Sequence, residues 1–379
     1  MSEQKFLHLG LGWIGDRGGG LERYQDGICR THAGMGYSVE AWVQSRIPID
    51  QECGYQVRAY ASPVESRLEK LRKLRALARD HFADEGFTFI SHHASVSSAL
   101  VGSLRNVAHI VHFQGPWADE ASFEGAPLWK TWLQRRAERK AYRSADRIIT
   151  LSQAFADLVI ARYGVDSDRV RVVPGGIDSE KADPGLSRRE ARVQLGWPTD
   201  RPIVLSVRRL VRRVGIDVLV EAAKAIVCRH PDLLIMIGGS GPLRQELESR
   251  IKDLDLADHV RLLGFVPDKD LPTAYAAADY TVVPTQCLEG FGLVTIESMA
   301  AGTPSIVTPV GSLPEIISPF SENLVLEGCS KKHIATRLDQ ILSCRLEMPN
   351  ACACRNYVKA TYDWCVVAPL VRDVYLLNN

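Results

Sequence analysis

The segment Tyr280-Thr-Val-Val-Pro-Thr-Gln-Cys-Leu-Glu-Gly-Phe-Gly-Leu-Val-Thr-Ile-Glu297 decides the fold class of this chain. It opens with a short run of aromatic and β-branched residues, which predicts a buried strand over 280–284. A loop with two glycines follows, and an apolar helical pattern then predicts a helix over 293–301. A strand, a glycine loop and a helix in this order form the repeating unit of a parallel sheet with crossover helices.

The same unit recurs through the second half of the chain. Short apolar runs predict further strands over residues 202–207, 233–237, 260–264 and 305–307. Longer periodic segments predict helices over residues 218–228, 243–252 and 271–278. This alternation predicts an α/β fold with a parallel, doubly wound sheet.

The first half alternates in the same manner. Its predicted strands are residues 6–9, 39–43, 88–90, 109–112 and 147–151, and a helix is predicted over residues 20–35. Glycine and proline then gather over residues 174–185, which indicates a linker. The 379 residues agree with two domains or three. We expect two doubly wound halves with a ligand cleft between the carboxyl ends of their strands.

The composition excludes several classes of protein. Apolar residues make up 46% and charged residues 24% of the chain, which is ordinary for a folded protein. Lys and Arg number 46 against 45 Asp and Glu, and this balance predicts no nucleic-acid partner. No apolar run approaches the ~18 residues that span a bilayer. Residues 1–10 lack a basic-then-apolar leader, and the nine cysteines lack zinc-ligand spacing, so we expect a cytoplasmic protein with reduced thiols.

The amino-terminal glycines fit two ligand hypotheses. Gly10-Leu-Gly-Trp-Ile-Gly15 has the spacing of a dinucleotide-binding turn, but residues 16–20 indicate a turn instead of a helix, and no acid ends the second strand. NAD binding is therefore the less favoured interpretation. Gly18-Gly-Gly20 lies directly before a helix, where bare backbone would let a phosphate approach the helix amides. The alternative is a loop whose glycines only satisfy turn geometry.

Two glutamates flank the glycine loop of the second half. Glu289 precedes Gly290 and Gly292, and Glu297 lies in the helix that follows. Loop amides and the helix dipole attract a phosphate, while carboxylates accept hydrogen bonds from sugar hydroxyls. The alternative is a plain turn with a solvent-facing Glu297. The position after a buried strand favours a ligand site.

Four arginines and a glycine loop follow neighbouring strands. Arg208-Arg-Leu-Val-Arg-Arg213 comes directly after the predicted strand over 202–207. Guanidinium groups bind phosphate oxygens in a bidentate manner, so we expect at least one of these arginines to bind phosphate. The alternative is a solvated basic turn. Gly238-Gly-Ser-Gly-Pro242 fits a ligand loop and an ordinary helix connection equally well.

The histidines and acidic pairs give weaker signals. His112 ends a predicted strand, where a packed or capping role competes with a catalytic one. His92 and His93 precede a helix that they could cap, and a metal role lacks a third ligand. Asp-x-Asp pairs beginning at Asp166, Asp253 and Asp268 fit a chance distribution. No metal and no other cofactor are therefore expected.

Taken in order, these motifs resemble family four of the retaining glycosyltransferases, also called glycosyltransferases group 1, which have the GT-B fold. The resemblance covers nearly the whole chain. The matching segments are residues 18–24, 145–152, 170–178, 264–267, 278–280, 289–297, 301–304 and 311–315. The resemblance implies an amino-terminal, acceptor-binding domain over 1–180 and a nucleotide-sugar-binding domain over 181–355, both Rossmann-like. It also implies a carboxyl-terminal helix over 356–379 that packs back toward the amino-terminal domain.

At matching positions the resemblance implies roles for individual residues. Glu297 would bind the ribose hydroxyls, and Arg209 would bind the pyrophosphate. Glu289 and the backbone of the five residues after it would hold the donor sugar and the distal phosphate. These five residues are Gly290, Phe291, Gly292, Leu293 and Val294. Four further residues would contribute backbone near the base or the phosphates: Phe265, Val266, Gly19 and Gly20. His112 would line the sugar site, and the implied catalytic set is His112, Glu289 and Arg209.

One departure from the family pattern concerns charge. Where the family commonly has a lysine five residues after the pyrophosphate arginine, this chain has Val214. We expect a neighbouring arginine to compensate, and Arg213 is favoured over Arg208 and Arg212 because it adjoins Val214. The alternative is that Val214 packs under the turn and the extra arginines face solvent.

The resemblance implies transfer of a sugar from a nucleoside diphosphate donor to a glycan or lipid-linked glycan, with retention of anomeric configuration and without metal. It further implies cell-surface polysaccharide or glycoconjugate biosynthesis. Three alternatives remain: a nucleotide-sugar epimerase or other enzyme on the same fold, a nicotinamide-dependent oxidoreductase, and an inactive sugar-nucleotide-binding subunit.

Two basic segments suggest contact with an anionic membrane surface. Residues 66–79 carry six basic residues against one acid and also hold four leucines, and residues 129–147 carry seven against two and open with Trp129 and Trp132. Basic helices with apolar or aromatic companions can lie on anionic lipid. The alternative, slightly favoured, is that the leucines face the core and the charges are solvated.

Overall fold

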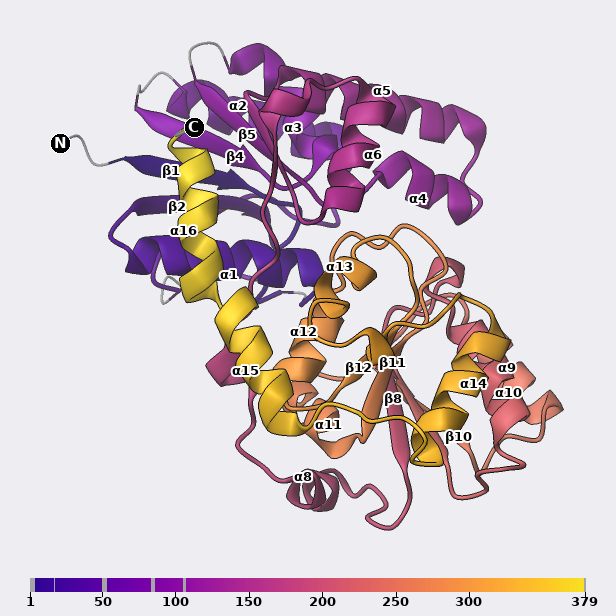
Figure 1. The fold of residues 1–379 in the computed structure, drawn as a ribbon. Helices are drawn as coiled ribbons and strands as arrows, with labels where there is room; N and C mark the ends of the chain where they lie inside the picture. The colour runs from indigo at the N-terminus through magenta and orange to yellow at the C-terminus, as the bar shows by residue number, and fades with distance from the viewer. Residues whose placement is uncertain (1–3, 17, 50–52, 83–85, 105–106, 378–379) are drawn as a thin grey trace. The chain divides into compact units, whose positions relative to one another are not determined.

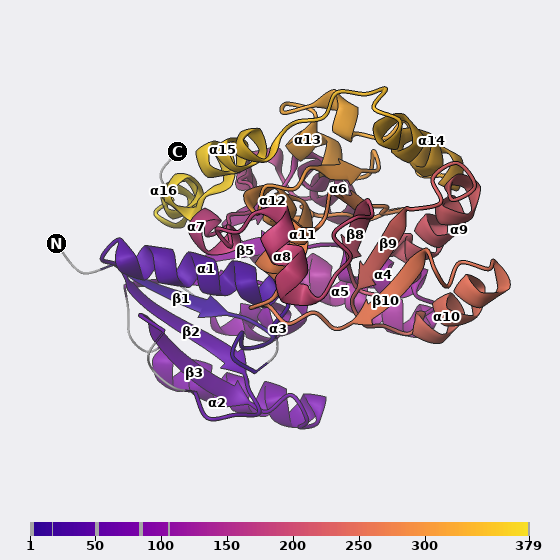
Figure 2. The same ribbon diagram turned by 90° about the horizontal axis from the view of Figure 1, so that it is seen from below.

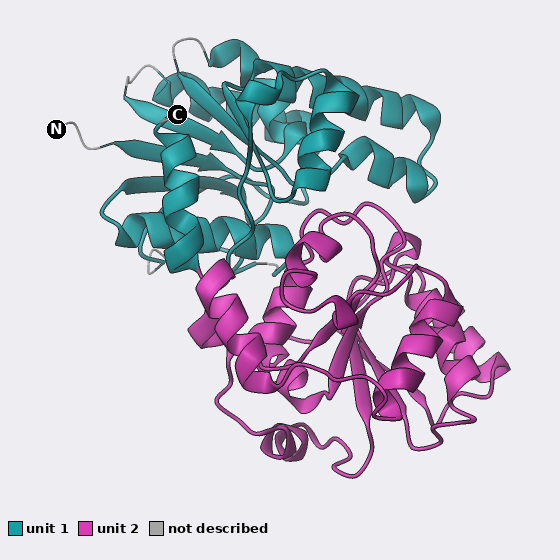
Figure 3. Cartoon of the chain, in the orientation of Figure 1, with its two compact units in different colours: residues 1–176, 364–379 teal, residues 177–363 magenta. Residues whose placement is uncertain are grey.

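The computed structural model describes residues 4–16, 18–49, 53–82, 86–104 and 107–377. The chain forms two compact units, which we call unit 1 (residues 1–176 and 364–379) and unit 2 (residues 177–363) (Figure 3). The chain first passes from unit 1 to unit 2 after Gly176, inside the linker predicted over residues 174–185. The units therefore divide at residues 176 and 363, where the sequence predicted 180 and 355.

Unit 1 is built on a parallel sheet in the order β3-β2-β1-β4-β5-β6-β7 among the described residues (Figure 1). Its strands are β1 (Lys5–Leu9), β2 (Ser38–Gln44), β3 (Gln56–Ala61), β4 (Phe87–Ser91), β5 (Ala108–Phe113), β6 (Arg147–Thr150) and β7 (Val170–Val172). Its helices are α1 (Gly20–Gly34), α2 (Arg67–His81), α3 (Ala94–Leu100), α4 (Trp117–Phe123), α5 (Leu128–Ser144), α6 (Gln153–Tyr163) and α16 (Trp364–Tyr375). Two short 3₁₀ turns, η1 (Val101–Ser103) and η2 (Ser167–Arg169), complete the described elements of this unit.

Unit 2 repeats the plan with a parallel sheet in the order β10-β9-β8-β11-β12. Its strands are β8 (Ile203–Val207), β9 (Leu234–Gly238), β10 (Val260–Gly264), β11 (Tyr280–Val283) and β12 (Ser305–Val307). Its helices are α7 (Ser179–Ala182), α8 (Arg188–Leu195), α9 (Ile216–Ile226), α10 (Arg244–Asp253), α11 (Leu271–Ala277), α12 (Leu293–Ala300), α13 (Leu313–Ile317), α14 (Lys331–Leu342) and α15 (Ala351–Tyr362). The 3₁₀ turns are η3 (Arg212–Val214) and η4 (Glu322–Leu324). Figure 2 shows helices on both faces of this sheet.

Both strand orders confirm the predicted α/β, doubly wound fold. In each unit the order runs outward from a central strand and then reverses, between β1 and β4 in unit 1 and between β8 and β11 in unit 2. Such a reversal leaves a crevice at the carboxyl ends of the two central strands, because the loops after them turn to opposite faces of the sheet. The reversal in unit 2 is where its ligand site is expected.

Local sequence explains where several helices begin. Ser66 caps α2 and Ser187 caps α8, each in a capping box with a glutamate three residues later, Glu69 and Glu190. No helix of the described residues is long and apolar enough to cross a membrane.

The carboxyl terminus differs from the single helix predicted over 356–379. The chain breaks at Asp363 into α15, which belongs to unit 2, and α16, which packs on α1 in unit 1. Trp364 begins α16 and lies against two glycines: a Cβ atom on Gly27 or Gly176 would be 2.4 Å from its indole ring. Bare backbone at these two positions therefore makes room for the indole.

Candidate functional site

The loops at the carboxyl edge of the unit 2 sheet are joined by backbone hydrogen bonds. After β8, the Arg208 N–H donates to Gly238 O (2.9 Å), and the Leu210 N–H donates to Ser240 O (3.0 Å) in the loop after β9. The Gly239 N–H donates to Gly264 O at the end of β10. These bonds connect loops that are far apart in the sequence. We call the loops after β8, β9, β10, β11 and β12 at this edge of the sheet the rim.

Glycines let these loops approach one another closely. A Cβ atom on Gly239 would be 1.8 Å from Arg208 O, and one on Gly311 would be 2.2 Å from Glu289 O. Both residues also have positive φ, which L side chains rarely adopt. The rim around Arg208 and Glu289 therefore depends on glycine at positions that come from two other loops.

Glu289 and Arg208 form a buried ion pair across the point where the strand order reverses. Arg208 Nη2 donates to Glu289 Oε2 at 2.6 Å, and the Thr285 hydroxyl donates to the same oxygen at 2.8 Å. Among the described residues, Oε1 accepts no hydrogen bond. Burial raises the pKa of Glu289, but the Arg208 guanidinium, the two hydrogen bonds and Arg213 together outweigh it, so the pKa lies below its ordinary value. Glu289 is thus a fixed carboxylate with one oxygen left for a ligand.

The glycine loop leads into α12 as predicted. Gly292 is the N-cap with φ +75°, and no side chain caps the first amides of this helix. Phe291 is buried with its ring on Tyr362, and Leu293 and Val294 begin the helix half-exposed. The helix start consequently presents uncapped amides beside Gly290 and Glu289, as an anion site requires.

Glu297 lies in the second turn of α12. The Tyr275 hydroxyl of α11 donates to Glu297 Oε2 at 3.2 Å, and the glutamate side chain is half-buried. Glu289 therefore precedes the start of α12, and Glu297 lies one turn into the helix. Which ligand groups they contact stays a prediction.

The four arginines after β8 have different surroundings. Arg209 is exposed, and its guanidinium makes no hydrogen bond or ion pair with the described residues. Arg212 is exposed and paired with Glu246 of α10 at 2.8 Å. Arg213 donates to Leu288 O at 3.2 Å, and Leu288 is held at φ +57°, a strained conformation for leucine. Val214 is 2% exposed, as the packing alternative supposed.

Phe265 and Val266 lie in the loop after β10. Phe265 is 66% exposed. Val266 packs against the core cluster of unit 2, and a Cβ atom on Gly238 would be 2.8 Å from its Cγ2. Both residues border the same rim, and their contact with a base stays a prediction.

The amino-terminal glycines of unit 1 start α1. This helix begins at Gly20, so Gly15 lies in a turn, which agrees with the argument against a dinucleotide motif. Gly19 is the N-cap and has no side-chain partner, but the Glu22 carboxylate lies close by: a Cβ on Gly19 would be 2.5 Å from its Oε2. That carboxylate opposes an anion at this helix start, and the phosphate role of Gly19 and Gly20 stays a prediction.

His112 belongs to a buried aromatic cluster in unit 1. It is 1% exposed, its Nδ1 is 3.0 Å from the Tyr24 hydroxyl, and its Nε2 is 2.6 Å from the Tyr375 hydroxyl. Its ring stacks on His92, which is 2.9 Å from His8. Both ring nitrogens are thus hydrogen-bonded to tyrosines within unit 1. The role of His112 in lining the sugar site stays a prediction.

The adjacent His93 has a different role from His92. Its side chain accepts a hydrogen bond from the Ser95 N–H and is the N-cap of α3. Capping was one of the interpretations that the sequence allowed, and it holds for His93 alone.

Sequence reasoning missed three features of the rim. It did not separate Arg208 from its neighbours, it gave Thr285 no role, and it did not assign Gly239 as a spacer. Gly239 directly follows β9, and Gly311 lies a few residues after β12, a signal that could have identified them. Nothing local distinguishes Arg208, because its partner Glu289 is 81 residues away.

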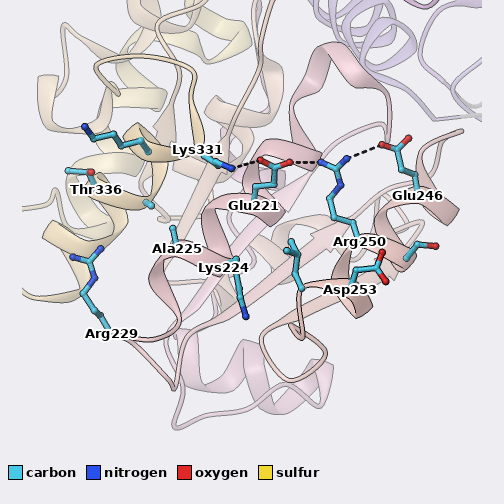
Figure 4. Close-up of a pocket in the computed structure, with 13 residues that line it drawn as sticks. Glu221, Lys224, Ala225, Arg229, Glu246, Arg250, Asp253, Lys331 and Thr336 are labelled. Atoms are coloured by element: carbon cyan, nitrogen blue, oxygen red, sulfur yellow. Dashed lines mark hydrogen bonds and ion pairs between the residues drawn. The ribbon is translucent and has the colours of Figure 1, made fainter.

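A separate cavity of about 740 Å³ lies between α9, α10 and α14 of unit 2 (Figure 4). Glu221 lies between two cations there, Lys331 at 3.0 Å and Arg250 at 2.6 Å. None of the predicted site residues lines this cavity. Because the glycine loop, Glu289, Glu297 and Arg209 all lie elsewhere, we do not place the ligand site there.

Two family models match the chain. Residues 18–181 match the model described as Glycosyltransferase Family 4, and residues 187–359 match the model described as Glycosyl transferases group 1. The chain belongs to glycosyltransferase family 4. The second match contains Arg208, Glu289 and Glu297, and thus the whole rim of unit 2.

The curated relatives of this chain described below are named as glycosyltransferases. A D-inositol 3-phosphate glycosyltransferase of Acidothermus cellulolyticus is 34% identical over 54% of this chain and 47% of its own length. One from Nocardiopsis dassonvillei is 28% identical over 94% of this chain and 89% of its own length. The chain spans about half the length of several curated relatives that it matches.

Solved structures share the fold. Sucrose-phosphate synthase from Thermosynechococcus elongatus has a TM-score of 0.80 at 23% identity, with 99% of this chain and 98% of that chain covered. HepE from Anabaena, solved in complex with UDP-glucose, has a TM-score of 0.78 at 17% identity, with 98% of each chain covered. At these identities the likeness concerns the fold, which is the GT-B fold of two Rossmann-like units.

Proposed function

We propose that this protein transfers a hexose-type sugar from a nucleoside diphosphate donor to a glycan or glycolipid acceptor. The observation that carries the proposal is the rim of unit 2, where a fixed carboxylate, an uncapped helix start and unpaired guanidinium nitrogens lie at the reversal of strand order. Carboxylates suit sugar hydroxyls, and amides with guanidinium groups suit phosphates. HepE, which shares the fold, was solved with such a donor.

The proposed donor site assigns one task to each residue. Glu297 binds the ribose hydroxyls, Glu289 binds the donor sugar through Oε1, and Arg209 binds the pyrophosphate. The amides of residues 290–294 bind the distal phosphate. The loop of Phe265 and Val266 lies beside the base.

The proposed reaction needs stabilisation of the departing diphosphate more than a protein nucleophile. The bond between the anomeric carbon and the phosphate oxygen breaks, and the acceptor oxygen bonds to that carbon with retention of configuration. The acceptor proton passes to the departing phosphate. Guanidinium and amide groups supply the positive field, so the reaction proceeds without metal. The products belong to cell-surface polysaccharide or glycoconjugate synthesis in the cytoplasm.

A donor panel tests this proposal. The full chain is incubated with UDP-, GDP-, ADP- and dTDP-sugars, and thermal shift and product mass are recorded. We expect stabilisation by one nucleotide series, slow release of the matching nucleoside diphosphate, and no loss of activity in EDTA. If no nucleotide or nucleotide-sugar produces a thermal shift, the proposal is wrong. Loss of activity in EDTA would overturn its metal-free part alone.

The same experiment separates the rival activities. An epimerase converts the donor to an isomer of equal mass and releases no diphosphate. An oxidoreductase, which the turn at Gly15 disfavours, is tested by adding a nicotinamide cofactor to the panel and recording its absorbance. An inactive binding subunit shows the thermal shift without any product.

The outer face of α5 supports a further part of the proposal, contact with an anionic membrane. Leu128, Trp129 and Trp132 are 83%, 67% and 56% exposed. The Arg136 guanidinium lies 5.0 Å from the Trp132 ring centroid. Glu138, the acid of this helix, is buried, and burial raises its pKa to about 7. The solvent-facing side of α5 is therefore aromatic and basic, a combination that suits the interface of an anionic bilayer.

The basic helix α2 fits this role less well. Leu74 is fully buried, and Leu71 and Leu77 are half-buried, as the packing alternative supposed. Only Leu68 among the four leucines is exposed. We therefore propose α5, and not α2, as the membrane-facing helix.

Sedimentation with vesicles tests the membrane proposal. We expect binding to vesicles that contain phosphatidylglycerol, weaker binding at high salt, and little binding to phosphatidylcholine alone. Trp129→Ser with Trp132→Ser should lower binding about tenfold, because exposed indoles enter the interface. The matched control is Leu68→Ser on α2, which should bind as the wild type does. Equal binding by both variants and the wild type would reject the assignment.

A further inference from the structure

Arg208 is the feature of the rim that the family resemblance does not account for. Its side chain is 9% exposed, and Nη2 is committed to Glu289. Its Nη1 is buried and makes no hydrogen bond among the described residues. An unsatisfied buried donor is costly, and a charged one more so. The guanidinium therefore has a site for one more acceptor.

Other unpartnered polar atoms lie close to the same place. Thr295 Oγ1 in the first turn of α12 and Ser312 Oγ are both buried without a hydrogen bond to any described residue. The Ser312 N–H donates to Glu289 O at 3.3 Å, and a Cβ on Gly292 would be 3.4 Å from Thr295 Oγ1 and 3.8 Å from Glu289 Cγ. Unsatisfied donors thus gather around Glu289 and the uncapped start of α12, where an oxygen-rich ligand would satisfy them.

The neighbouring arginines are less well placed to replace the missing lysine. Arg212 is exposed and paired with Glu246, and Arg213 donates to the Leu288 carbonyl. Val214 is buried and carries no charge. Arg213 also helps to lower the pKa of Glu289, so the preference for Arg213 that adjacency to Val214 suggested stays a prediction.

We propose that Arg208 supplies the second cation of the donor diphosphate site, with Nη2 on Glu289 and Nη1 on a phosphate oxygen. This inference rests on the proposed function. It makes Arg208 a phosphate-binding residue and also the positioning residue of Glu289. One guanidinium would then contact both Glu289, which holds the sugar, and the diphosphate, which departs from the sugar.

The chemistry explains why arginine suits this place. Negative charge grows on the departing diphosphate as the bond to the anomeric carbon breaks, so a fixed cation stabilises the transition state more than the bound donor. A planar guanidinium can contact two acceptors in fixed directions, whereas an ammonium on a flexible stem cannot fix both. Arg208 would thus raise turnover in addition to affinity.

Calorimetry on the full chain tests the phosphate contact. The probes are UDP, GDP, ADP and dTDP, and for whichever binds, the corresponding nucleoside without phosphates. Arg208→Gln should weaken diphosphate binding about tenfold, the loss of one charge-assisted hydrogen bond, and change nucleoside binding less than about twofold. Arg208→Lys should recover part of the affinity. The matched control Arg212→Gln, on the same turn, should bind like the wild type.

The pH profile tests the positioning role. Without Arg208, burial of Glu289 is opposed by fewer positive groups, so the pKa of Glu289 rises. The acid limb of kcat/KM should therefore move to higher pH in Arg208→Gln and remain in place in Arg212→Gln. If the Arg208–Glu289 pair had only a structural role, Arg208→Gln would lower stability, but the acid limb of its correctly folded fraction would stay in place.

The outcomes separate this inference from the proposed function. If the wild type binds no nucleotide, the proposed function fails. If the wild type binds a diphosphate and Arg208→Gln binds it equally well, or loses nucleoside affinity to the same degree, the phosphate contact is overturned while the function stands. An unchanged acid limb overturns the positioning role.

Discussion

Replacing Glu289 by Gln is expected to lower kcat by about 100-fold or more, which corresponds to at least about 2.7 kcal/mol of transition-state stabilisation. The amide retains the shape of the side chain and can still accept from Thr285. It loses the charge that balances Arg208, and breaking a buried pair in this way costs about 3–5 kcal/mol. Steady-state kinetics on the donor that the panel identifies measures the effect, alongside a thermal unfolding curve.

Glu297→Gln should fail in a different manner. Loss of a charge-assisted hydrogen bond to ribose costs about 1.5–3 kcal/mol, expressed chiefly as weaker donor binding. Glu246→Gln is the matched control for both, because Glu246 pairs with Arg212 at the surface. Small and equal effects of Glu289→Gln and Glu297→Gln would contradict both assignments.

Acidification is expected to destabilise unit 1 strongly. Burial lowers the pKa of His92 to about 3 and those of His32 and His109 to about 4, and it lowers the pKa of His8 and His112 as well. Neighbouring histidines lower the last two further, while a backbone carbonyl partly offsets the effect at His32 and Asp146 partly offsets it at His109. These histidines stay neutral in the folded unit and take up protons on unfolding.

The sign follows from proton uptake. Below pH 6.5 these histidines bind more protons in the unfolded chain than in the folded one, so they lower the free energy of unfolding as pH falls toward about 4. Glu138, with a pKa raised to about 7, acts in the opposite direction but is a single group. His32, His92 and His109 each lower the free energy of unfolding by about 2 kcal/mol at pH 5. Together these three reach the lower end of the whole stability of a domain, ~5–15 kcal/mol. Urea unfolding of the full chain between pH 7.5 and 5, followed by circular dichroism, measures the slope.

Two variants isolate the histidine contribution. His92→Gln removes one titrating group and should reduce the pH slope by about 1.4 kcal/mol per pH unit. Tyr375→Phe removes the hydrogen bond to His112 but no histidine, so it should lower stability at every pH and leave the slope unchanged. A wild-type stability that stays constant from pH 6.5 to 5 would contradict the buried, neutral state of this cluster.

Much of the fold could be predicted because it depends on local patterns. Apolar runs at β8 to β12 and the helical periods between them mark buried strands and half-buried helices, whatever the distant sequence is. The strands β3 and β7 escaped prediction. β3 lies at an edge with Gln56 and Arg58 exposed, and β7 has three residues, so neither shows a continuous apolar run.

The candidate site was predicted in part for the same reason. Glu289, the glycine loop and α12 are contiguous, and a glycine loop after a buried strand is recognisable without a structure. Val214 was recognised as a departure from the family pattern, but the favoured compensating residue was Arg213. Spacing alone cannot tell which of four arginines in one irregular loop turns inward, because a loop has no period that fixes side-chain direction.

The sequence by itself determined the α/β class, the position of the linker, and the glycine loop with its two glutamates. Each of these depends on hydrophobic burial and backbone conformation, which neighbouring residues determine. Tertiary structure alone decided that Arg208 pairs with Glu289, 81 residues away, and that His112 meets Tyr375, 263 residues away. Those pairs arise when the sheet brings distant loops and the carboxyl-terminal helix together. Burial then leaves each polar group only the partners within reach, and no local pattern specifies which partners those are.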